Sequence, residues 1–202
     1  MKIGLFFGSF NPIHHGHLMV ASYIANHTEL QQIWLVVSPQ NPHKTQASLL
    51  NEYDRLHLAQ LAIEDDDQIK VSDIEFKLPK PSYTIDTLTY IQEQFPQHEF
   101  SVIMGGDSFQ NLPKWKNFEM LIKNYQFIVY RRPGFEITEM HGARVQYLEA
   151  PMLELSATLI RNNCKDGITI RYLVPEKVRE EIERNNYFKE EVVKTSSGKK
   201  SI

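Results

Sequence analysis

The sequence predicts an α/β fold: a doubly wound parallel sheet with a small helical part at the C-terminus. Two observations support this expectation. Short apolar runs alternate, from the first residues onward, with segments that have helical spacing, which is the pattern of a doubly wound sheet. The runs are also apolar throughout, as in strands that are buried on both faces. The alternation ends near Pro151, beyond which only helices are expected.

Four apolar runs bounded by turn residues predict strands, at Ile3–Phe7, Ile33–Val37, Val102–Met104 and Phe127–Tyr130. The first helix is expected from Gly16 to about Asn26, because apolar or small residues there recur at helical spacing, at Leu18, Ala21, Ser22 and Ala25. Later helices are expected over 51–64, from residue 84 to before Pro96, from 106 until Pro113, and over 117–123. Asn51 suits an N-cap, and proline stops a helix.

The C-terminal part predicts two more helices, over 156–163 and 175–185. The second begins at Pro175 and carries several opposite charges one turn apart. Residues 189–202 are polar and are expected to form a flexible tail. No repeat or linker interrupts residues 1–188, which predict a single domain.

Composition narrows the class of protein. The 202 residues hold 22 Lys plus Arg and 25 Asp plus Glu, a formal charge of −3, which argues against a protein that coats nucleic acid or an anionic membrane. The one cysteine, Cys164, cannot form an intramolecular disulfide. No run has the length of a signal peptide core or a membrane span. We therefore expect a cytoplasmic protein without nucleic-acid or membrane partners. The sequence leaves the oligomeric state open, and a homo-oligomer is possible.

The loop after the first predicted strand is the most informative segment. It runs Gly8-Ser9-Phe10-Asn11-Pro12-Ile13-His14-His15-Gly16-His17 and opens the first helix. Ligands of open α/β sheets bind at this edge, and a helix start favours phosphate through its N–H groups and partial positive charge. The glycines let the backbone turn and approach a ligand. His14 and His17, three residues apart, can face the same anion.

Other interpretations of this loop are weaker. Loop histidines can be solvated or structural, and a zinc site is a further alternative, although no Cys or carboxylate stands at ligand spacing nearby. Neither a dinucleotide-binding glycine pattern nor a P-loop occurs. The flanking glycines and the position on the first strand-to-helix turn favour a phosphate ligand.

Gly8-x-Phe10-x-Pro12-x-His14-x-Gly16-His17 resembles the motif of the nucleotidyltransferase superfamily named for its His-x-Gly-His signature. The second half of that signature follows in the expected order, as Ser156-Ala157-Thr158-Leu159-Ile160-Arg161. Four further segments resemble the bacterial nicotinate-nucleotide adenylyltransferases of this superfamily: Asn41-Pro42-His43-Lys44, Ser82-Tyr83-Thr84-Ile85-Asp86-Thr87-Leu88, Gly105-Gly106-Asp107 with Trp115, and Arg131-Arg132-Pro133-Gly134.

The resemblance runs from Lys2 to about Phe188, with two departures. Position 9 is Ser where the family often has Gly, and position 11 is Asn where it often has Asp. Both departures bear on how ATP is positioned. The resemblance implies a Rossmann-like nucleotidyltransferase fold.

The implied reaction is attack by the 5′-phosphate of nicotinate mononucleotide on the α-phosphorus of ATP. The products are nicotinate adenine dinucleotide and pyrophosphate, a step of NAD biosynthesis. No general base is needed, because a phosphate monoester with a second pKa of about 6 is mostly ionised at neutral pH. Catalysis then depends on orientation and charge neutralisation. Mg²⁺ is expected with ATP, held mainly by phosphate oxygens and water, and no protein ligand is named for it.

The resemblance assigns the catalytic residues to the two motifs. His14 and His17 are expected to donate to the triphosphate, with His17 nearest the α-phosphate, and Arg161 to bind the β- and γ-phosphates. The expected ATP-binding set is Gly8, Ser9, Phe10, His14, His17, Lys44, Gly106, Asp107, Ser156, Thr158 and Arg161. Asp107 can accept from ribose hydroxyls, although a helix N-cap fits it equally well. Lys44 can also be only a solvated loop residue.

The expected mononucleotide-binding residues are Tyr83, Thr84, Trp115 and Arg132. Trp115 lies in a Pro-Lys-Trp-Lys segment and is expected to stack on the cationic pyridine ring, with core packing as the alternative. The N–H groups where the third helix begins, at Tyr83 and Thr84, are expected to bind the nicotinate carboxylate. The side chain of Tyr83 can also serve only in packing.

Phosphopantetheine adenylyltransferases and cytidylyltransferases share the first motif, but segment 83–88 and the spacing from Gly105 to Trp115 disfavour them. A class I aminoacyl-tRNA synthetase would need a longer chain and a basic surface for tRNA. A non-catalytic nucleotide-binding regulator would not require both histidines together with Ser156, Thr158 and Arg161.

Overall fold

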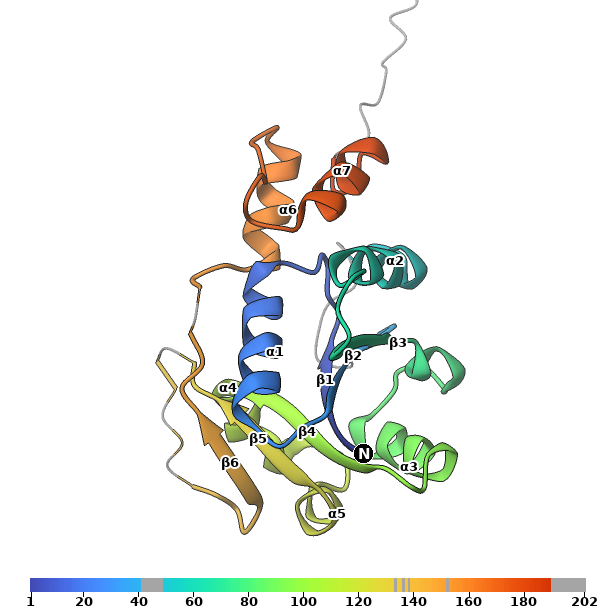
Figure 1. Ribbon diagram of the computed structural model, residues 1–202, viewed down its shortest axis with the longest axis vertical. Helices are drawn as coiled ribbons and strands as arrows, with labels where there is room; N and C mark the ends of the chain where they lie inside the picture. The colour runs from blue at the N-terminus through green and yellow to red at the C-terminus, as the bar shows by residue number, and fades with distance from the viewer. Residues whose placement is uncertain (41–48, 133, 136, 138, 152, 190–202) are drawn as a thin grey trace, which may run out of the picture.

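The computed structural model describes residues 1–40, 49–132, 134–135, 137, 139–151 and 153–189. These residues form a parallel sheet in the order β3-β2-β1-β4-β5-β6, with helices on both faces (Figure 1). The strands are β1 (Lys2–Gly8), β2 (Gln32–Val37), β3 (Ile69–Ser72), β4 (Glu99–Gly105), β5 (Gln126–Tyr130) and β6 (Arg144–Leu148). The predicted doubly wound parallel sheet is confirmed.

The helices follow the strands in alternation up to β5. They are α1 (His15–His27), α2 (Glu52–Ala62), α3 (Thr84–Gln94), α4 (Gly106–Gln110), α5 (Phe118–Asn124), α6 (Ala157–Lys165) and α7 (Glu176–Arg184), with 3₁₀ turns η1 (Ile74–Lys77) and η2 (Leu112–Lys114). None of the helices in the described part of the chain is long and apolar enough to span a membrane.

Two hydrophobic cores form because successive residues of a strand point to opposite faces of the sheet. In β5, Ile128 belongs to the core that also holds buried residues of α1 and α2, whereas Phe127 and Val129 belong to the core that holds those of α3, α4 and α5. All three side chains are buried. The central strands therefore carry apolar residues at consecutive positions, which explains the four unbroken apolar runs of the sequence.

The order of the strands creates a crevice between β1 and β4. From β1 the chain winds outward to β2 and β3, and from β4 it winds outward in the opposite direction to β5 and β6. At such a switch point the loops after the two central strands diverge, and ligands bind at the carboxyl ends of those strands.

The four predicted strands and the helices near the predicted positions are confirmed, but the apolar runs did not reveal β3 and β6. Both lie at an edge of the sheet and are mostly half-buried or exposed, so polar residues interrupt their apolar pattern. The predicted stripe of α1 was partly wrong. Ser22 is exposed, and the buried residues of this helix are Val20, Ala21, Ile24 and Ala25.

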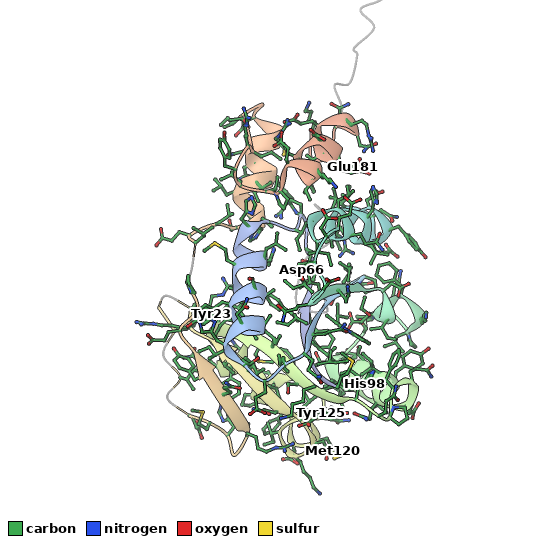
Figure 2. All side chains as sticks on the ribbon, viewed as in Figure 1. Tyr23, Asp66, His98, Met120, Tyr125 and Glu181 are labelled. Atoms are coloured by element: carbon green, nitrogen blue, oxygen red, sulfur yellow. The ribbon has the colours of Figure 1, made fainter. Side chains whose placement is uncertain are left out.

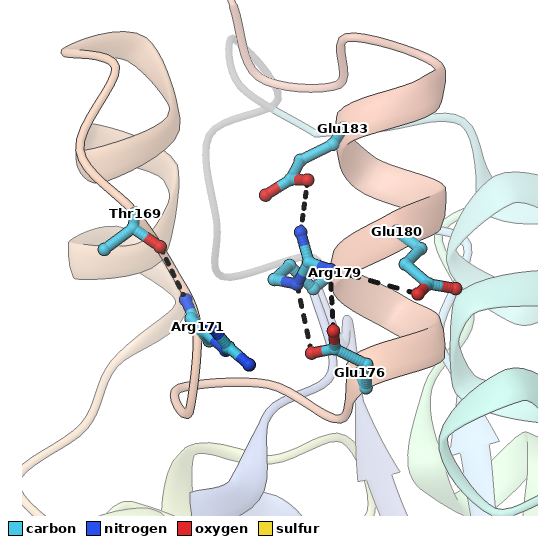
Figure 3. Close-up of polar contacts among 6 residues, drawn as sticks. All are labelled: Thr169, Arg171, Glu176, Arg179, Glu180 and Glu183. Atoms are coloured by element: carbon cyan, nitrogen blue, oxygen red, sulfur yellow. Dashed lines mark hydrogen bonds and ion pairs between the residues drawn. The ribbon is translucent and has the colours of Figure 1, made fainter.

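The C-terminal helices α6 and α7 lie beyond the end of the sheet, next to α1 and α2 (Figure 1). Pro175 precedes α7 rather than opening it. Arg179 lies among three glutamates of this helix, Glu176, Glu180 and Glu183 (Figure 3), and donates to Glu176 with two nitrogens, at 2.7 and 3.0 Å. The predicted charge pairs are thus present, and as pairs on the surface they contribute little to stability.

One carboxylate of α7 is buried rather than exposed. Glu181 lies where α7 adjoins α2 (Figure 2), with its Oε1 3.6 Å from Nε2 of His57 on α2. Val178 and Ile182 of α7 are buried in the core shared with α1 and α2. Apolar burial together with this polar contact attaches the helical part to the sheet domain. The predicted tail lies outside the described residues from 190 onward.

Candidate active site

A cavity of about 590 Å³ opens at the carboxyl ends of β1 and β4, a volume typical of small-molecule sites. Most of the predicted site residues line it: Gly8, Ser9, Phe10, His14, His17, Tyr83, Thr84, Asp107, Trp115, Arg132, Ser156, Thr158 and Arg161. Gly106, the buried first residue of α4, is not among the residues that line it. Lys44 lies outside the described residues.

Two glycines of the first loop leave room for neighbouring rings. A Cβ atom on Gly8 would lie 2.8 to 3.0 Å from three ring atoms of Phe10, and one on Gly16 would lie 3.0 Å from the ring of His14. Phe10 has a φ of 43°, which few non-glycine residues adopt, and its buried ring packs edge-on against that of His17 at 5.1 Å. A side chain at Gly8 would therefore displace the ring of Phe10, and one at Gly16 would need the ring of His14 to move by a few tenths of an ångström.

His14 and His17 lie side by side, as the sequence predicted. Their rings stack with centroids 3.7 Å apart, at the start of α1, where His14 is the N-cap residue without capping through its side chain. His14 is buried, and within the described residues its Nδ1 has no hydrogen-bond partner. Burial, and to a lesser degree the positive charge of Arg132 and of His15, lowers the pKa of His14 to about 4. His14 is therefore neutral at pH 7 and offers one N–H to a ligand.

The lowered pKa of His14 predicts a loss of stability in acid. Between pH 6.5 and 4 the unfolded chain binds a proton at this residue that the folded chain does not, so the free energy of unfolding falls as the pH falls. By pH 4, this difference in proton binding at His14 is expected to lower the free energy of unfolding by about 3 kcal/mol. We expect chemical denaturation from pH 7 to 4.5 to show a steeper pH dependence for the wild type than for His14→Asn. Equal slopes would contradict this assignment.

Arg161 of α6 joins the second motif to the first loop. Its Nη1 donates to the carbonyl oxygen of Asn11 at 2.9 Å, and its Nη2 donates to Oγ1 of Thr158 at 3.1 Å. Ser156 is the N-cap of α6, where its hydroxyl oxygen accepts from the N–H of Leu159 at 3.2 Å. The two sequence motifs, far apart in the chain, thus form one wall of the cavity.

The departure at position 11 has a structural explanation. Oδ1 of Asn11 accepts a hydrogen bond from the backbone N–H of Leu50 at 3.1 Å, and its side chain is buried. The amide oxygen of asparagine accepts this bond as a carboxylate oxygen would, but carries no negative charge. Asn11 therefore connects the first loop to the chain that leads into α2.

Arg55 of α2 is a fully buried cation that the sequence analysis missed. It donates to the carbonyl oxygens of Ser9 at 2.6 Å and Ser38 at 2.8 Å through Nη1, and to those of Pro39 and Leu50, each at 2.9 Å, through Nη2 and Nε. Burial lowers its pKa to about 10, so it stays charged at neutral pH. It connects the loops after β1 and β2 to the start of α2.

Asp107, Arg132 and Tyr130 form a polar cluster at the end of β4 and β5. Nε of Arg132 lies 3.5 Å from Oδ1 of Asp107, and its guanidinium lies over the ring of Tyr130, 5.7 Å from the centroid. A Cβ on Gly105 would lie 2.5 Å from Oδ1 of Asp107, so glycine is required there. Asp107 as an N-cap is wrong, since Gly105 is the N-cap residue and Asp107 lies within the first turn of α4.

The far end of the cavity is formed by the start of α3 and by Trp115. Tyr83 is the N-cap residue of α3 and Thr84 its first residue, as predicted. Nζ of Lys116 lies 4.8 Å above the ring of Tyr83 and 2.7 Å from Asp86. Trp115 is partly buried against the core on the α3 side and also lines the cavity, so its two predicted roles are compatible.

A second buried charged residue, Glu75, was also missed, and the sequence carried a signal for Arg55 alone. Arg55 precedes Leu58 by three residues and Ala59 by four, so it falls on the buried face of α2. Glu75 alternates with Asp73 and Lys77 around Ile74 and Phe76, so the pattern alone predicts an exposed residue. A charged residue at a position that periodicity predicts to be buried indicates a specific polar network, because an unpaired buried charge is costly.

Comparisons with known proteins agree with the fold and with both motifs. The family model described as cytidylyltransferase-like matches residues 5–163. A protein of Flavobacterium psychrophilum named a probable nicotinate-nucleotide adenylyltransferase is 46% identical over 192 residues, which cover 94% of this chain and 100% of the relative. One of Cytophaga hutchinsonii with the same name is 49% identical over 189 residues, covering 93% and 98%.

A solved structure of the Plasmodium falciparum nicotinic acid mononucleotide adenylyltransferase, complexed with NaAD, shares the fold. Its TM-score is 0.78 at 22% identity, with 93% of this chain and 97% of that chain covered. The family assignment rests on the full-length sequence relatives, and the solved structure supports the fold alone. The sheet order, the His14–His17 pair, the Ser156-to-Arg161 motif and these matches together show that the chain belongs to the nicotinate-nucleotide adenylyltransferase family of nucleotidyltransferases.

Proposed function

We propose that this chain transfers the adenylyl group of ATP to nicotinate mononucleotide. A phosphate oxygen of the mononucleotide forms a bond to the α-phosphorus of ATP, the bond from that phosphorus to the bridging oxygen breaks, and pyrophosphate leaves. The observation that carries this proposal is one cavity with two chemically different ends. The His14–His17 pair and Arg161 border one end, and the start of α3 with Trp115 borders the other.

The first end suits the triphosphate. His17 and His14 offer ring N–H groups at the start of α1, whose partial positive charge adds to theirs. Arg161, held by its bond to the loop at Asn11, offers a planar fork to the β- and γ-phosphates. We assign Ser156 and Thr158 to the same phosphates. A triphosphate beside His14 would raise the pKa of that ring, because a negative charge favours the imidazolium form.

The remaining assignments follow the same division. We assign Gly8, Ser9 and Phe10 to the backbone surface that approaches ATP, and Asp107 to the ribose hydroxyls. Lys44 and Gly106 complete the proposed ATP set by their place in the family motifs alone. Tyr83, Thr84, Trp115 and Arg132 are assigned to the mononucleotide, Trp115 by stacking on the pyridine ring.

Magnesium would reach this site with ATP. The carboxylates among the described cavity residues are Glu75 and Asp107, and the described residues contain no cluster of three metal-ligating side chains. This donor set fits an ion held by phosphate oxygens and water rather than by a protein cage. When bound, Mg²⁺ would neutralise charge on the triphosphate. We further propose that residues 1–188 act as one domain and that the reaction is cytoplasmic, as the single cysteine indicates.

The test is pyrophosphate release with Mg²⁺ and ATP, with nicotinate mononucleotide, nicotinamide mononucleotide and phosphopantetheine as acceptors in separate reactions. We expect turnover with the first and little with the other two. Turnover mainly with another acceptor would retain adenylyl transfer and overturn the assignment of the α3 end. A folded protein that binds ATP and turns over none of the three would instead be a nucleotide-binding regulator.

A further inference from the structure

Glu75 is a buried carboxylate in the wall of the cavity, at the α3 end. It lies in the 3₁₀ turn η1, its exposed fraction is 3%, and it is one of the cavity-lining residues. Arg55, the other buried charge near this edge of the sheet, donates to backbone carbonyls. Glu75 is instead held by hydroxyl groups.

Two of the hydroxyl donors, Ser82 and Thr87, come from the segment that begins α3, and a third, Ser38, follows β2. Oε2 of Glu75 accepts from Oγ of Ser82 at 2.9 Å, and Oε1 accepts from Oγ1 of Thr87 at 2.8 Å. Ser82 immediately precedes Tyr83, and Thr87 lies one turn beyond Thr84, so the two bonds flank the residues assigned to the mononucleotide. Both hydroxyl groups belong to buried residues.

These contacts determine where the first turn of α3 lies relative to the cavity. Thr87 also bonds Tyr83 through its backbone, whose N–H donates to the carbonyl oxygen of Tyr83 at 3.1 Å. The N-cap residue Tyr83 forms no capping bond through its own side chain. The position of this turn therefore depends on side chains around it, of which Glu75 contacts both ends.

A packing role alone does not explain a carboxylate at this position. Burial raises the pKa of Glu75, while hydrogen bonds from Thr87, Ser38 and Ser82 act in the opposite direction. Replacing buried charged groups by apolar residues of similar volume is often neutral or stabilising. An apolar residue cannot supply hydrogen-bond acceptors for the hydroxyl groups of Thr87 and Ser82, which lie 12 and 7 residues away in sequence.

We propose that Glu75 is a positioning residue for mononucleotide binding: it holds the first turn of α3 through Ser82 and Thr87 and so sets the affinity for the mononucleotide without contacting ATP. The inference rests on the proposed function, because it takes the α3 end of the cavity as the acceptor site. Glu75 would thus affect binding of the acceptor substrate indirectly, through the residues that are expected to contact it.

The test compares Thr87→Val with Thr89→Val in steady-state kinetics for both substrates. Both changes replace a hydroxyl by a methyl group on α3, but the hydroxyl of Thr89 donates to Ile85 within the helix, at 2.9 Å, and Thr89 is exposed. We expect Thr87→Val to raise KM for nicotinate mononucleotide about five- to tenfold, as for the loss of one buried hydrogen bond. We expect its KM for ATP to change less than about twofold, and Thr89→Val to change neither KM by more than that.

Glu75→Gln and Glu75→Leu separate positioning from general damage. Glutamine keeps the shape and can still bond both hydroxyls, whereas leucine cannot, so the rise in KM for the mononucleotide should be smaller in Glu75→Gln than in Glu75→Leu. The inference would be overturned if Thr87→Val changed both KM values equally, or if Thr87→Val and Thr89→Val had equal effects. In either case, turnover of nicotinate mononucleotide by the wild type would still support the proposed function. A folded wild type without turnover of nicotinate mononucleotide would overturn both.

Discussion

Replacing His17 with alanine is expected to lower kcat about 100- to 1000-fold, as for the loss of one donor to a transition state. His17 lies in the first turn of α1, lines the cavity and stacks on His14. Its ring would neutralise charge that grows on the α-phosphate as the phosphorus becomes five-coordinate. Because this interaction strengthens in the transition state, kcat and kcat/KM should fall by similar factors. Pyrophosphate release with ATP and nicotinate mononucleotide measures both.

His15→Ala is the matched control. His15 is the neighbouring histidine of the same helix and does not line the cavity, so we expect kcat to stay within about threefold of the wild type. A folded His17→Ala protein with most of its kcat would remove His17 from the chemistry. Equal losses in the two variants would point to damage to the start of α1 rather than to a lost donor.

Replacing Arg55 with methionine is expected to lower the free energy of unfolding by at least about 3 kcal/mol. The side chain satisfies four buried or part-buried carbonyl groups, and each such group left without a donor costs about 1–3 kcal/mol. For a chain of this size, a loss of this order lowers Tm by roughly 6–12 °C. Thermal unfolding followed by circular dichroism measures the shift.

Arg144→Met is the control for this change. Arg144 is exposed on the edge strand β6, and its guanidinium donates to the carbonyl oxygen of Asn124 at 3.1 Å. A surface substitution of this kind is expected to change the free energy of unfolding by no more than about 0.5 kcal/mol. A similar Tm for the two variants would show that water replaces the contacts of Arg55 and that its burial has little energetic consequence.

The sequence predicted the centre of the sheet better than its edges. A strand that is covered on both faces buries residues at consecutive positions. The strands β1, β2, β4 and β5 therefore contain continuous apolar runs that can be recognised in the sequence. An edge strand such as β6 is only partly buried: Arg144 and Tyr147 are exposed, and the three other residues are half-buried. Five residues of that kind resemble a loop, so the strand emerges only from its pairing with β5.

Two kinds of site residue could be predicted to different degrees. His14, His17, Ser156 and Arg161 belong to contiguous motifs, in which the local backbone brings chemistry-bearing side chains together, and they line one cavity. Asp107 was predicted for the cavity as well, but its alternative role as an N-cap was wrong because α4 begins two residues earlier than that role requires.

What the sequence by itself determined is the local part of this protein: the strand-helix alternation, the first loop with its two glycines, and the motif that begins α6. These depend on side chains within about one turn of each other, so spacing alone encodes them. Only the tertiary structure decided that Glu75 is buried and which groups Arg55 and Glu75 hold. Arg55 bonds Ser9 and Ser38, and Glu75 bonds Ser82 and Thr87, because the crossovers of the sheet bring separate loops to one edge. A buried charge is stable only with such partners, and partners supplied by other segments leave no periodic trace in the sequence.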